Sequence, residues 1–592
     1  MTSRTAVRTY LSPSMVLLAL DWPDSADHTD FLGFAIKRTP GFLHQTTSWL
    51  PNRINFKRST VAAVDHDSNV APIQKFMWWD ARFGSDHTTA TEFDYEVSAV
   101  LGTPAAPLID PSSTTIVHVK IPNHVVNGIG TWFNRAVVSS QAFSALLAKL
   151  AITNNETPTV EQNLTLRSWL SNGMEQGLID CINNADELTG AIYHLTDLLW
   201  VIPALSTKGV SAPIDIVYDA VWGKDKAKNP VEPPTEKVAI PKLAGKAVFH
   251  PRDKTHIMHN KFFVAGRRLN DPAHSAPNRV VMGSANYTSG GLTSQANLIH
   301  TFESPELASH YLARYQLLKT NPALQDTASE TGWSSLETVG DANVRVCFSP
   351  EPSSKSKTKP FAKRESIDTV VQAVSEAKSS VLFCLFSPTD EPLRQACFAA
   401  GDRGRMMFGL VNNISNREGL EPEDSMAADE KAAIELYHRS KNQRDVVPAA
   451  YFVWDNKPTG FLTERQLFPG ENRPEYAPVI VHHKFIVIDG ETDHPIIYSG
   501  SANMSKNSVN FNDENLLEIS GSRGVADIYM AEFFRLYEHY RARAHWVAVH
   551  VNGHPESDLM LKGTRDEWAG KFLRPGSPES RARVAMVKPV LT

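Results

Sequence analysis

Two short segments of the chain carry a histidine and a lysine two positions apart. His259 and Lys261 form the first pair, and His482 and Lys484 form the second. Apolar residues follow each pair, which is typical of a buried strand. Because side chains at positions i and i+2 of a strand point to the same face, each histidine is expected to project beside its lysine.

Each pair is followed by the sequence Gly-Ser-x-Asn. The first copy ends in Asn286 and the second in Asn503. Two such half-sites facing each other would gather two imidazoles, two ammonium groups and two carboxamides. Lysine and asparagine can hold the non-bridging oxygens of a phosphodiester and stabilise the charge of its transition state. One histidine could attack phosphorus while the other protonates the leaving oxygen.

The elements that must position these residues occur in the same order twice. Helices and strands alternate from about residue 160 and again from about residue 366, and each run ends in a predicted helix, over 305–318 and 524–540. A shared order of features in two parts of a chain indicates an internal duplication. Strands that alternate with helices predict an α/β fold with a largely parallel sheet in each part.

The duplicated motifs resemble those of the phospholipase D superfamily, which carries His-x-Lys-x4-Asp and then Gly-Ser-x-Asn in each half. The second copy matches fully, with Asp489 as the motif aspartate, whereas Gly266 stands at that place in the first copy. The resemblance spans about residues 160–550. It implies two α/β halves related by a pseudo-twofold axis, and a metal-independent phosphodiesterase that forms a phosphohistidine intermediate and needs no cofactor. The catalytic residues that it implies are His259, Lys261, Asn286, His482, Lys484 and Asn503.

The resemblance also suggests residues that support the site. Each catalytic histidine needs an acceptor for its second ring nitrogen, and we expect Glu514 beside His482 and Gln295 beside His259. A carboxylate partner would raise the pKa of His482 and favour its imidazolium, so His482 is predicted to be the general acid. His259 would then be the neutral nucleophile, as is common for the N-terminal half in this family. Further supporting residues are predicted to be Ser284, Ser501 and Asp489.

The chain has 592 residues, about four times the length of a typical domain of roughly 150 residues. We expect an N-terminal β-rich module over 1–155, a first phospholipase D-like half over 156–340, and a second half with a C-terminal extension over 341–592. Short apolar stretches separated by Pro, Gly, Asn and Asp predict the strands of the first module. Both half-sites lie in one chain, so the active site does not require a dimer, and the oligomeric state is left open.

The composition excludes several classes of protein. Hydrophobic residues make up 42% and charged residues 21%, as in ordinary globular proteins. No apolar run approaches the roughly 20 residues that span a bilayer, so stable membrane insertion is not expected. The four cysteines form no Cys-x-x-Cys pair and no signal peptide is recognisable, which favours a reduced, cytoplasmic location. A metal centre is not expected, because two lysines beside the histidines would repel a divalent cation.

Three functions remain open for the site. The net charge of −6 is unlike the basic surplus of a dedicated nucleic-acid-binding protein. We therefore expect hydrolysis or transfer of a phospholipid or a small diester. A nuclease or a nucleic-acid end-processing diesterase is the first alternative, and an inactive binding or scaffold protein is the second. The sequence does not decide between a lipid and a nucleic-acid substrate.

Overall fold

The computed structural model describes most of the chain. The described residues are 3–57, 64–83, 89–137, 140–152, 158–225, 227–268, 275–328, 332–351, 364–423, 425–449, 480–551 and 560–588. Among them, no helix is both long enough and apolar enough to cross a lipid bilayer.

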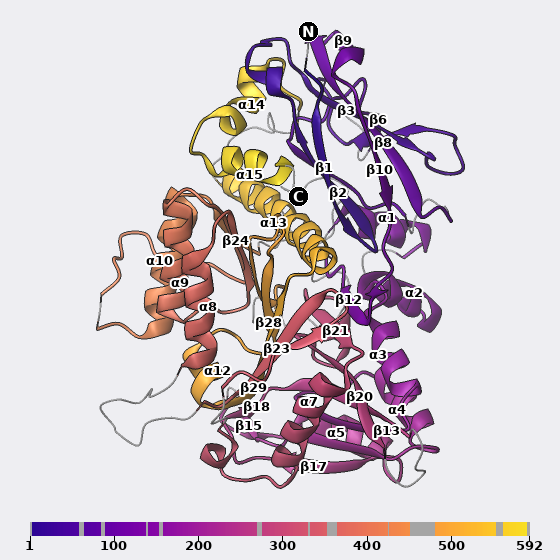
Figure 1. Cartoon of the computed structure of the whole chain (residues 1–592), viewed down its shortest axis with the longest axis vertical. Helices are drawn as coiled ribbons and strands as arrows, with labels where there is room; N and C mark the ends of the chain where they lie inside the picture. The colour runs from indigo at the N-terminus through magenta and orange to yellow at the C-terminus, as the bar shows by residue number, and fades with distance from the viewer. Residues whose placement is uncertain are drawn as a thin grey trace.

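The N-terminal part of the chain forms two antiparallel sheets, as its short apolar stretches predict (Figure 1). The first sheet contains β1 (Ala6–Ser12), β2 (Met15–Asp21) and β7 (Met77–Asp80). The second contains β10 (Thr115–Lys120), β8 (Glu92–Thr103), β3 (Gly33–Thr39), β4 (Ser48–Trp49) and β9 (Ala106–Ile109). Buried aromatic and aliphatic side chains of these strands share a core with the C-terminal helix α14 (Arg565–Leu573). The β-rich N-terminal module is therefore confirmed.

The rest of the chain contains two larger mixed sheets. The first has the order β11 (Val125–Val126), β12 (Ile129–Phe133), β21 (Leu298–Phe302), β20 (Ala276–Gly283), β19 (Lys261–Arg267), β13 (Glu187–Ile192), β14 (Ile214–Asp219) and β17 (Val248–Arg252). The second has the order β22 (Glu337–Val339), β23 (Ala342–Ser349), β29 (Asn512–Ser520), β28 (Ile496–Gly500), β27 (Lys484–Ile488), β24 (Ser380–Leu385), β25 (Met406–Val411) and β26 (Val446–Pro448). Corresponding strands run in the same relative directions in both sheets. This agreement is what an internal duplication predicts.

The expectation of largely parallel sheets is wrong. Apart from the short strand β18 (Ile257–Met258), which pairs in parallel with β29, the parallel strands lie at one end of each sheet. They are β13, β14 and β17 in the first sheet and β24, β25 and β26 in the second. The strand that follows each His-x-Lys pair lies antiparallel to its neighbours on both sides. It is joined to the next strand by a hairpin connection, which requires antiparallel pairing, whereas a crossover helix is needed only between parallel strands.

Helices cover the outer face of each sheet, and a common core lies between the sheets. The outer helices of the first half are α3 (Met174–Asn183), α4 (Val201–Lys208) and α5 (Pro234–Lys242), and those of the second half are α8 (Glu365–Glu376), α9 (Glu391–Asp402) and α10 (Ala428–Asn442). The last helices of the two halves, α7 (Pro305–Lys319) and α13 (Arg523–Val551), pack in the common core with both inner sheet faces.

Elements from the two ends of the chain cross the expected domain boundaries. The strands β11 and β12 precede residue 155 but complete the edge of the first large sheet. The C-terminal helices α13 and α15 (Pro578–Val587) pack on β1 and β2, so the first strands and the last helices of the chain lie side by side (Figure 1). The boundaries at residues 155 and 340 themselves remain a prediction.

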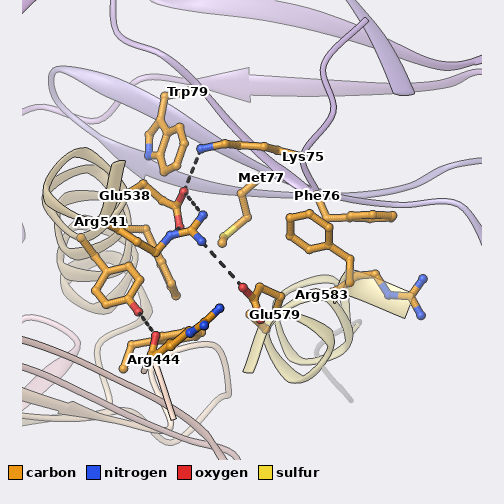
Figure 2. Close-up of a pocket in the computed structure, with 14 residues that line it drawn as sticks. Lys75, Phe76, Met77, Trp79, Arg444, Glu538, Arg541, Glu579 and Arg583 are labelled. Carbon is orange, nitrogen blue, oxygen red and sulfur yellow. Dashed lines mark hydrogen bonds and ion pairs between the residues drawn. The ribbon is translucent and has the colours of Figure 1, made fainter. Parts of the chain in front are cut away.

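A small cavity marks the contact between the N-terminal strands and the C-terminal helices (Figure 2). Its volume of about 30 Å³ is enough for one or two water molecules. A chain of ion pairs lines it. Lys75 Nζ lies 2.8 Å from Glu538 Oε2, Arg541 lies 2.7 Å from the same oxygen, and Arg541 reaches Glu579 at 3.7 Å. Burial raises the pKa of Glu538, but Arg541 and Lys75 outweigh it and hold the pKa well below its usual range.

The Glu538→Gln substitution should destabilise this contact. It leaves two cations without their shared carboxylate, so we expect a loss of about 3 kcal/mol in the free energy of unfolding at pH 7. A carboxylate whose pKa is lowered by folding stabilises above its unfolded pKa, so the difference from wild type should shrink as pH falls below about 4.5. Chemical denaturation at pH 7 and pH 3.5 measures both. The exposed pair Lys441–Glu418 supplies the control, because Glu418→Gln should have no measurable effect. Equal denaturation midpoints for the two variants at pH 7 would contradict this role of Glu538.

Candidate active site

Each His-x-Lys motif lies against the last strand of the other half. The short strand β18 (Ile257–Met258) pairs in parallel with the start of β29, and the His259 amide donates to the Asp513 carbonyl at 2.9 Å. In the second half the His482 amide donates to the Ala296 carbonyl at 3.0 Å, just before β21. These reciprocal contacts bring both motifs to the boundary between the two sheets.

The basic side chains of the two motifs lie close enough to influence one another electrostatically. Burial, followed by the charges of Lys484, Lys261 and His259, lowers the pKa of His482 well below its usual value. Burial and the charge of Lys261 likewise lower the pKa of His259 to about 4, against the upward effect of Glu514. All four of these residues are at least nine-tenths buried. The structure therefore brings the predicted histidines and lysines into one site.

The two lysines are held in the same way. Lys261 Nζ donates to the His259 carbonyl at 2.6 Å, and Lys484 Nζ donates to the His482 carbonyl at 2.7 Å. Because an ammonium group carries three protons, donors remain for a bound oxyanion. Burial lowers the pKa of Lys484 to about 7, and burial together with the Lys484 charge lowers the pKa of Lys261 well below its usual value. A site that holds buried cations in this way favours an anionic ligand.

The prediction of which residue contacts each histidine is wrong. His259 Nδ1 lies 2.9 Å from Glu514 Oε1, so the carboxylate serves His259 and not His482. His482 Nδ1 lies 2.9 Å from Asn297 Oδ1, so Asn297 is the partner of His482. Glu514 takes the place that was expected for Gln295 beside His259. The reason is the crossing of the strands: a residue at the start of β29 lies beside the motif of the first half, and a residue before β21 lies beside the motif of the second half.

The partners also set the tautomers of the histidines. Burial raises the pKa of Glu514, but the charge and hydrogen bonding of His259 outweigh it and lower the pKa below its usual value. Since an ionised carboxylate only accepts, its position 2.9 Å from Nδ1 favours the tautomer of neutral His259 with the proton on Nδ1 and the lone pair on Nε2. Asn297 donates through Nδ2 to the Gly291 carbonyl, which directs its Oδ1 to His482 and gives His482 the same tautomer.

The serines of the two Gly-Ser-x-Asn motifs support the strands beside the site. Ser284 donates to Asn297 Oδ1 at 2.9 Å and accepts from the Leu298 amide at 3.1 Å. Ser501 accepts from the Asn515 amide at 3.0 Å. Both serines are fully buried, so they act on the neighbouring strand and do not face a substrate.

The asparagines of these motifs have unused hydrogen-bonding capacity. Among the described residues, the buried Oδ1 atoms of Asn286 and Asn503 have no hydrogen-bond partner. Buried polar atoms are rarely left in this state unless a ligand or water completes them. Rotation of each amide by 180° would offer its NH₂ group to an anion, since the orientation of an amide is not fixed without partners.

Asp489 directly follows β27 and stabilises a turn at the end of that strand. It adopts the left-handed conformation with φ of 52°, and its carboxylate accepts from the amides of Lys378, Ser379 and Ser380 at 2.7–3.1 Å. At the corresponding place, Gly266 lies inside β19, which continues to Arg267 through an irregular register. The first half has no turn there, so it does not need the aspartate.

Two aromatic residues of the site were missed by the sequence analysis. Tyr193 follows β13 and Phe386 follows β24, and their rings lie 4.9 and 5.5 Å from the imidazoles of His259 and His482. Lys261 Nζ lies over the ring of Tyr193 at 4.9 Å. The signal was the equivalent position of the two aromatic residues in the repeat, directly after the first strand of each half.

The described residues contain no group of three or more His, Cys, Asp or Glu side chains that could hold a metal ion.

Comparison with known proteins gives the family. Residues 370–537 match the sequence model described as "Cardiolipin synthase, PLD-like domain". The matched segment includes the His482, Lys484 and Asn503 positions, and the first half repeats both the motifs and the order of the strands. Residues 370–537 therefore form a phospholipase D-like domain. A search of curated proteins finds no match.

Several solved structures are similar to parts of this chain. Phosphatidylserine synthase of Haemophilus influenzae is 13% identical, with 71% of this chain and 94% of that chain aligned and a TM-score of 0.42. Nuc of Salmonella typhimurium is 18% identical over 35% of this chain and 95% of that chain, with a TM-score of 0.19. Yeast tyrosyl-DNA phosphodiesterase is 10% identical over 57% of this chain and 84% of that chain, with a TM-score of 0.28. Similarities at this level do not indicate a substrate.

The site should bind oxyanions with an affinity that falls as the pH rises. Lys484 has a pKa of about 7 in the empty site, and a bound anion favours its charged form, so binding should take up protons. Calorimetry with tungstate at pH 6, 7.5 and 9 should therefore show progressive weakening. Lys484→Ala should weaken binding at pH 6 by about tenfold or more, whereas the exposed Lys120→Ala should leave it unchanged. An affinity that is independent of pH would contradict this view of the site.

The Gly266→Asp substitution, which restores the family motif, should destabilise the protein without raising its activity. A Cβ atom at Gly266 would lie 2.8 Å from Ser275 Oγ and 3.5 Å from Glu187 Cβ, and the new carboxylate would lie near that of Glu187. We expect a loss of about 1–3 kcal/mol in the free energy of unfolding. Gly266→Ala, which adds the clash without the charge, should have a smaller effect. A more stable Gly266→Asp variant would show that a turn can form there.

Proposed function

We propose that this chain is a metal-independent phosphodiesterase that works through a covalent phosphohistidine. The observation that supports it is the convergence of two His–Lys pairs from different halves, each with an oriented imidazole. His259 and His482 are buried and held at Nδ1 by Glu514 and Asn297, which leaves Nε2 of each ring for chemistry.

The pairing of His259 with Glu514 supports its role as the nucleophile. Nε2 attacks phosphorus and forms a P–N bond, and the carboxylate stabilises the positive charge that develops on the ring. The P–O bond to the leaving group breaks as His482 gives that oxygen its Nε2 proton. Lys261, Lys484 and the two motif asparagines stabilise the negative charge on the non-bridging oxygens.

The pairing of His482 with a neutral amide supports its role as the acid. Without a carboxylate partner its imidazolium is a stronger acid, and a bound phosphodiester anion offsets the repulsion by the lysines that lowers its pKa. In the second step neutral His482 takes a proton from water, whose oxygen attacks phosphorus. The P–N bond then breaks, and its electron pair returns to His259 Nε2. The proposal thus gives each histidine the role that was predicted from the sequence. The predicted physical reason, a carboxylate beside His482, was wrong.

We further propose that the substrate is a phospholipid or another small diester and that the protein acts in the cytoplasm. The net charge of −6 supports the first part, because a long nucleic acid would be repelled. The four cysteines, which are buried and free, support a reducing compartment. A nucleic-acid diesterase is the alternative.

A substrate screen in EDTA tests the reaction class. Bis-p-nitrophenyl phosphate should be hydrolysed without metal, and a phosphatidylcholine vesicle should be cleaved in preference to single-stranded DNA. An added alcohol separates transfer from hydrolysis. Cleavage of DNA alone would replace the lipid proposal with the nuclease, and no cleavage of any diester would support an inactive binding protein.

The intermediate should form on His259 and accumulate when His482 is removed. With bis-p-nitrophenyl phosphate, whose leaving group needs no acid, His482→Ala should still form the adduct but hydrolyse it slowly. His259→Ala should form none. Quenching in base, where phosphohistidine survives, and peptide mass spectrometry locate the adduct. His118→Ala, at an exposed histidine of β10, should behave as wild type. An adduct on His482 and none on His259 would reverse the roles.

A further inference from the structure

A buried ionic cluster lies directly beside the Glu514–His259 pair. Asp513, the residue before Glu514, is fully buried. Its Oδ2 lies 2.8 Å from Nε of Arg252, and its Oδ1 lies 2.9 Å from a terminal nitrogen of Arg314. The Thr327 hydroxyl also donates to Oδ1 at 3.3 Å. A carboxylate of the second half is thus held by two arginines of the first half, from β17 and α7.

The main chain of Asp513 holds the segment that carries the proposed nucleophile. Its carbonyl accepts from the His259 amide at 2.9 Å and from Asn260 Nδ2 at 3.0 Å. Movement of Asp513 would therefore move His259 and Glu514 together with the start of β29.

Arg314 also contacts Ser349, which is hydrogen-bonded to the main chain of Glu514. It donates to the Ser349 carbonyl at 2.5 Å. The Ser349 hydroxyl accepts from the Glu514 amide at 3.2 Å and donates to the Asn512 carbonyl at 3.0 Å. The Asn512 side chain donates in turn to Glu514 Oε1 at 2.9 Å. The backbone on both sides of Glu514 is therefore fixed by groups that contact this cluster.

The corresponding segment of the first half differs in charge. When the two copies of Asn-Leu are aligned, Gln295 and Ala296 stand where the second half has Asp513 and Glu514. The histidine beside that segment, His482, contacts the neutral Asn297. The ionic cluster is thus built around the segment of the second half that supplies a carboxylate to a histidine.

Stability alone is a weak reason for such a cluster. Three ionised groups in the interior lose hydration, and an apolar replacement of similar volume is often equally stable or more stable. We infer that the Arg252–Asp513–Arg314 cluster is a positioning device that keeps the Glu514 carboxylate on Nδ1 of His259. This inference rests on the proposed function, because it assigns the cluster a role in preparing the nucleophile.

The test is the rate of adduct formation compared with the affinity for an oxyanion. Arg252→Met keeps the volume of the side chain and removes its contact with Asp513. We expect the burst of p-nitrophenolate from bis-p-nitrophenyl phosphate to slow by about tenfold or more. The Kd for tungstate should change less than about twofold, because Lys261 and Lys484 are not touched.

Two variants serve as controls. Arg252→Lys keeps the charge and can still reach Asp513, so its burst rate should stay within about threefold of wild type. Arg439→Met removes a similarly buried arginine, which pairs with Asp445 at 2.6 Å away from the site, and it should change neither the burst rate nor tungstate binding. Should Arg252→Met not fold, Arg252→Gln replaces it, with the same expected direction.

The pH dependence separates positioning from a simple charge effect. Loss of a nearby positive charge alone would raise the pKa of His259, whereas loss of the Glu514 contact would lower it. The pH at which the burst rate reaches half its maximum should therefore move down in Arg252→Met.

Several results would overturn the inference. They are an upward movement of that pH, a burst rate equal to wild type, an Arg252→Lys variant as slow as Arg252→Met, or a parallel loss of tungstate binding. A wild-type chain that binds tungstate but forms no adduct would instead refute the proposed function, and the inference would fail with it.

Discussion

The arrangement of the site depends on the reciprocal backbone contacts between each His-x-Lys motif and the last strand of the other half. His259 is hydrogen-bonded to the main chain of Asp513, and His482 to that of Ala296. Neither half contains a complete environment for its own histidine. The two halves must therefore pack together before either imidazole has a partner, and the core between them includes apolar side chains of both halves.

The electrostatics of the site follow from this packing. Two lysines and two histidines are buried together, and loss of hydration lowers the pKa of each one. Repulsion by neighbouring positive charges lowers the pKa values of His259, Lys261 and His482 further. Such a group is poorly stabilised when the site is empty. A bound anion such as the proposed phosphodiester would reverse both effects, since it supplies the missing charge and acceptors for the lysine protons. The unfavourable free energy of burying these basic groups thus favours an anion as the ligand of the site.

Although the strand order is duplicated, the two half-sites differ chemically. One histidine lies beside a carboxylate and the other beside an amide, a difference that suits the proposed roles of nucleophile and acid. The asymmetry comes from a few residues before the last strand of each half, Gln295 to Asn297 and Asp513 to Asn515. The ionic cluster around Asp513 lies on the carboxylate side, where the orientation of a charged group matters most.

The sequence by itself determined the class of fold, the β-rich N-terminal module and the residues that are proposed to carry the chemistry. Spacing along a strand and repetition of the motif are local properties, so His259, Lys261, His482 and Lys484 could be recognised without a structure. The partners of the histidines could not, because Glu514 lies 255 positions from His259 and contacts it only where strands of different halves cross.

The direction of the strands and the effect of Gly266 were also decided by the tertiary structure. Alternating helices and strands do not reveal that the strand after each motif returns antiparallel, nor that β19 continues where the second half turns at Asp489. Composition and periodicity report which side chains are buried. They do not report which buried groups meet, because that depends on how two sheets far apart in the sequence pack against each other.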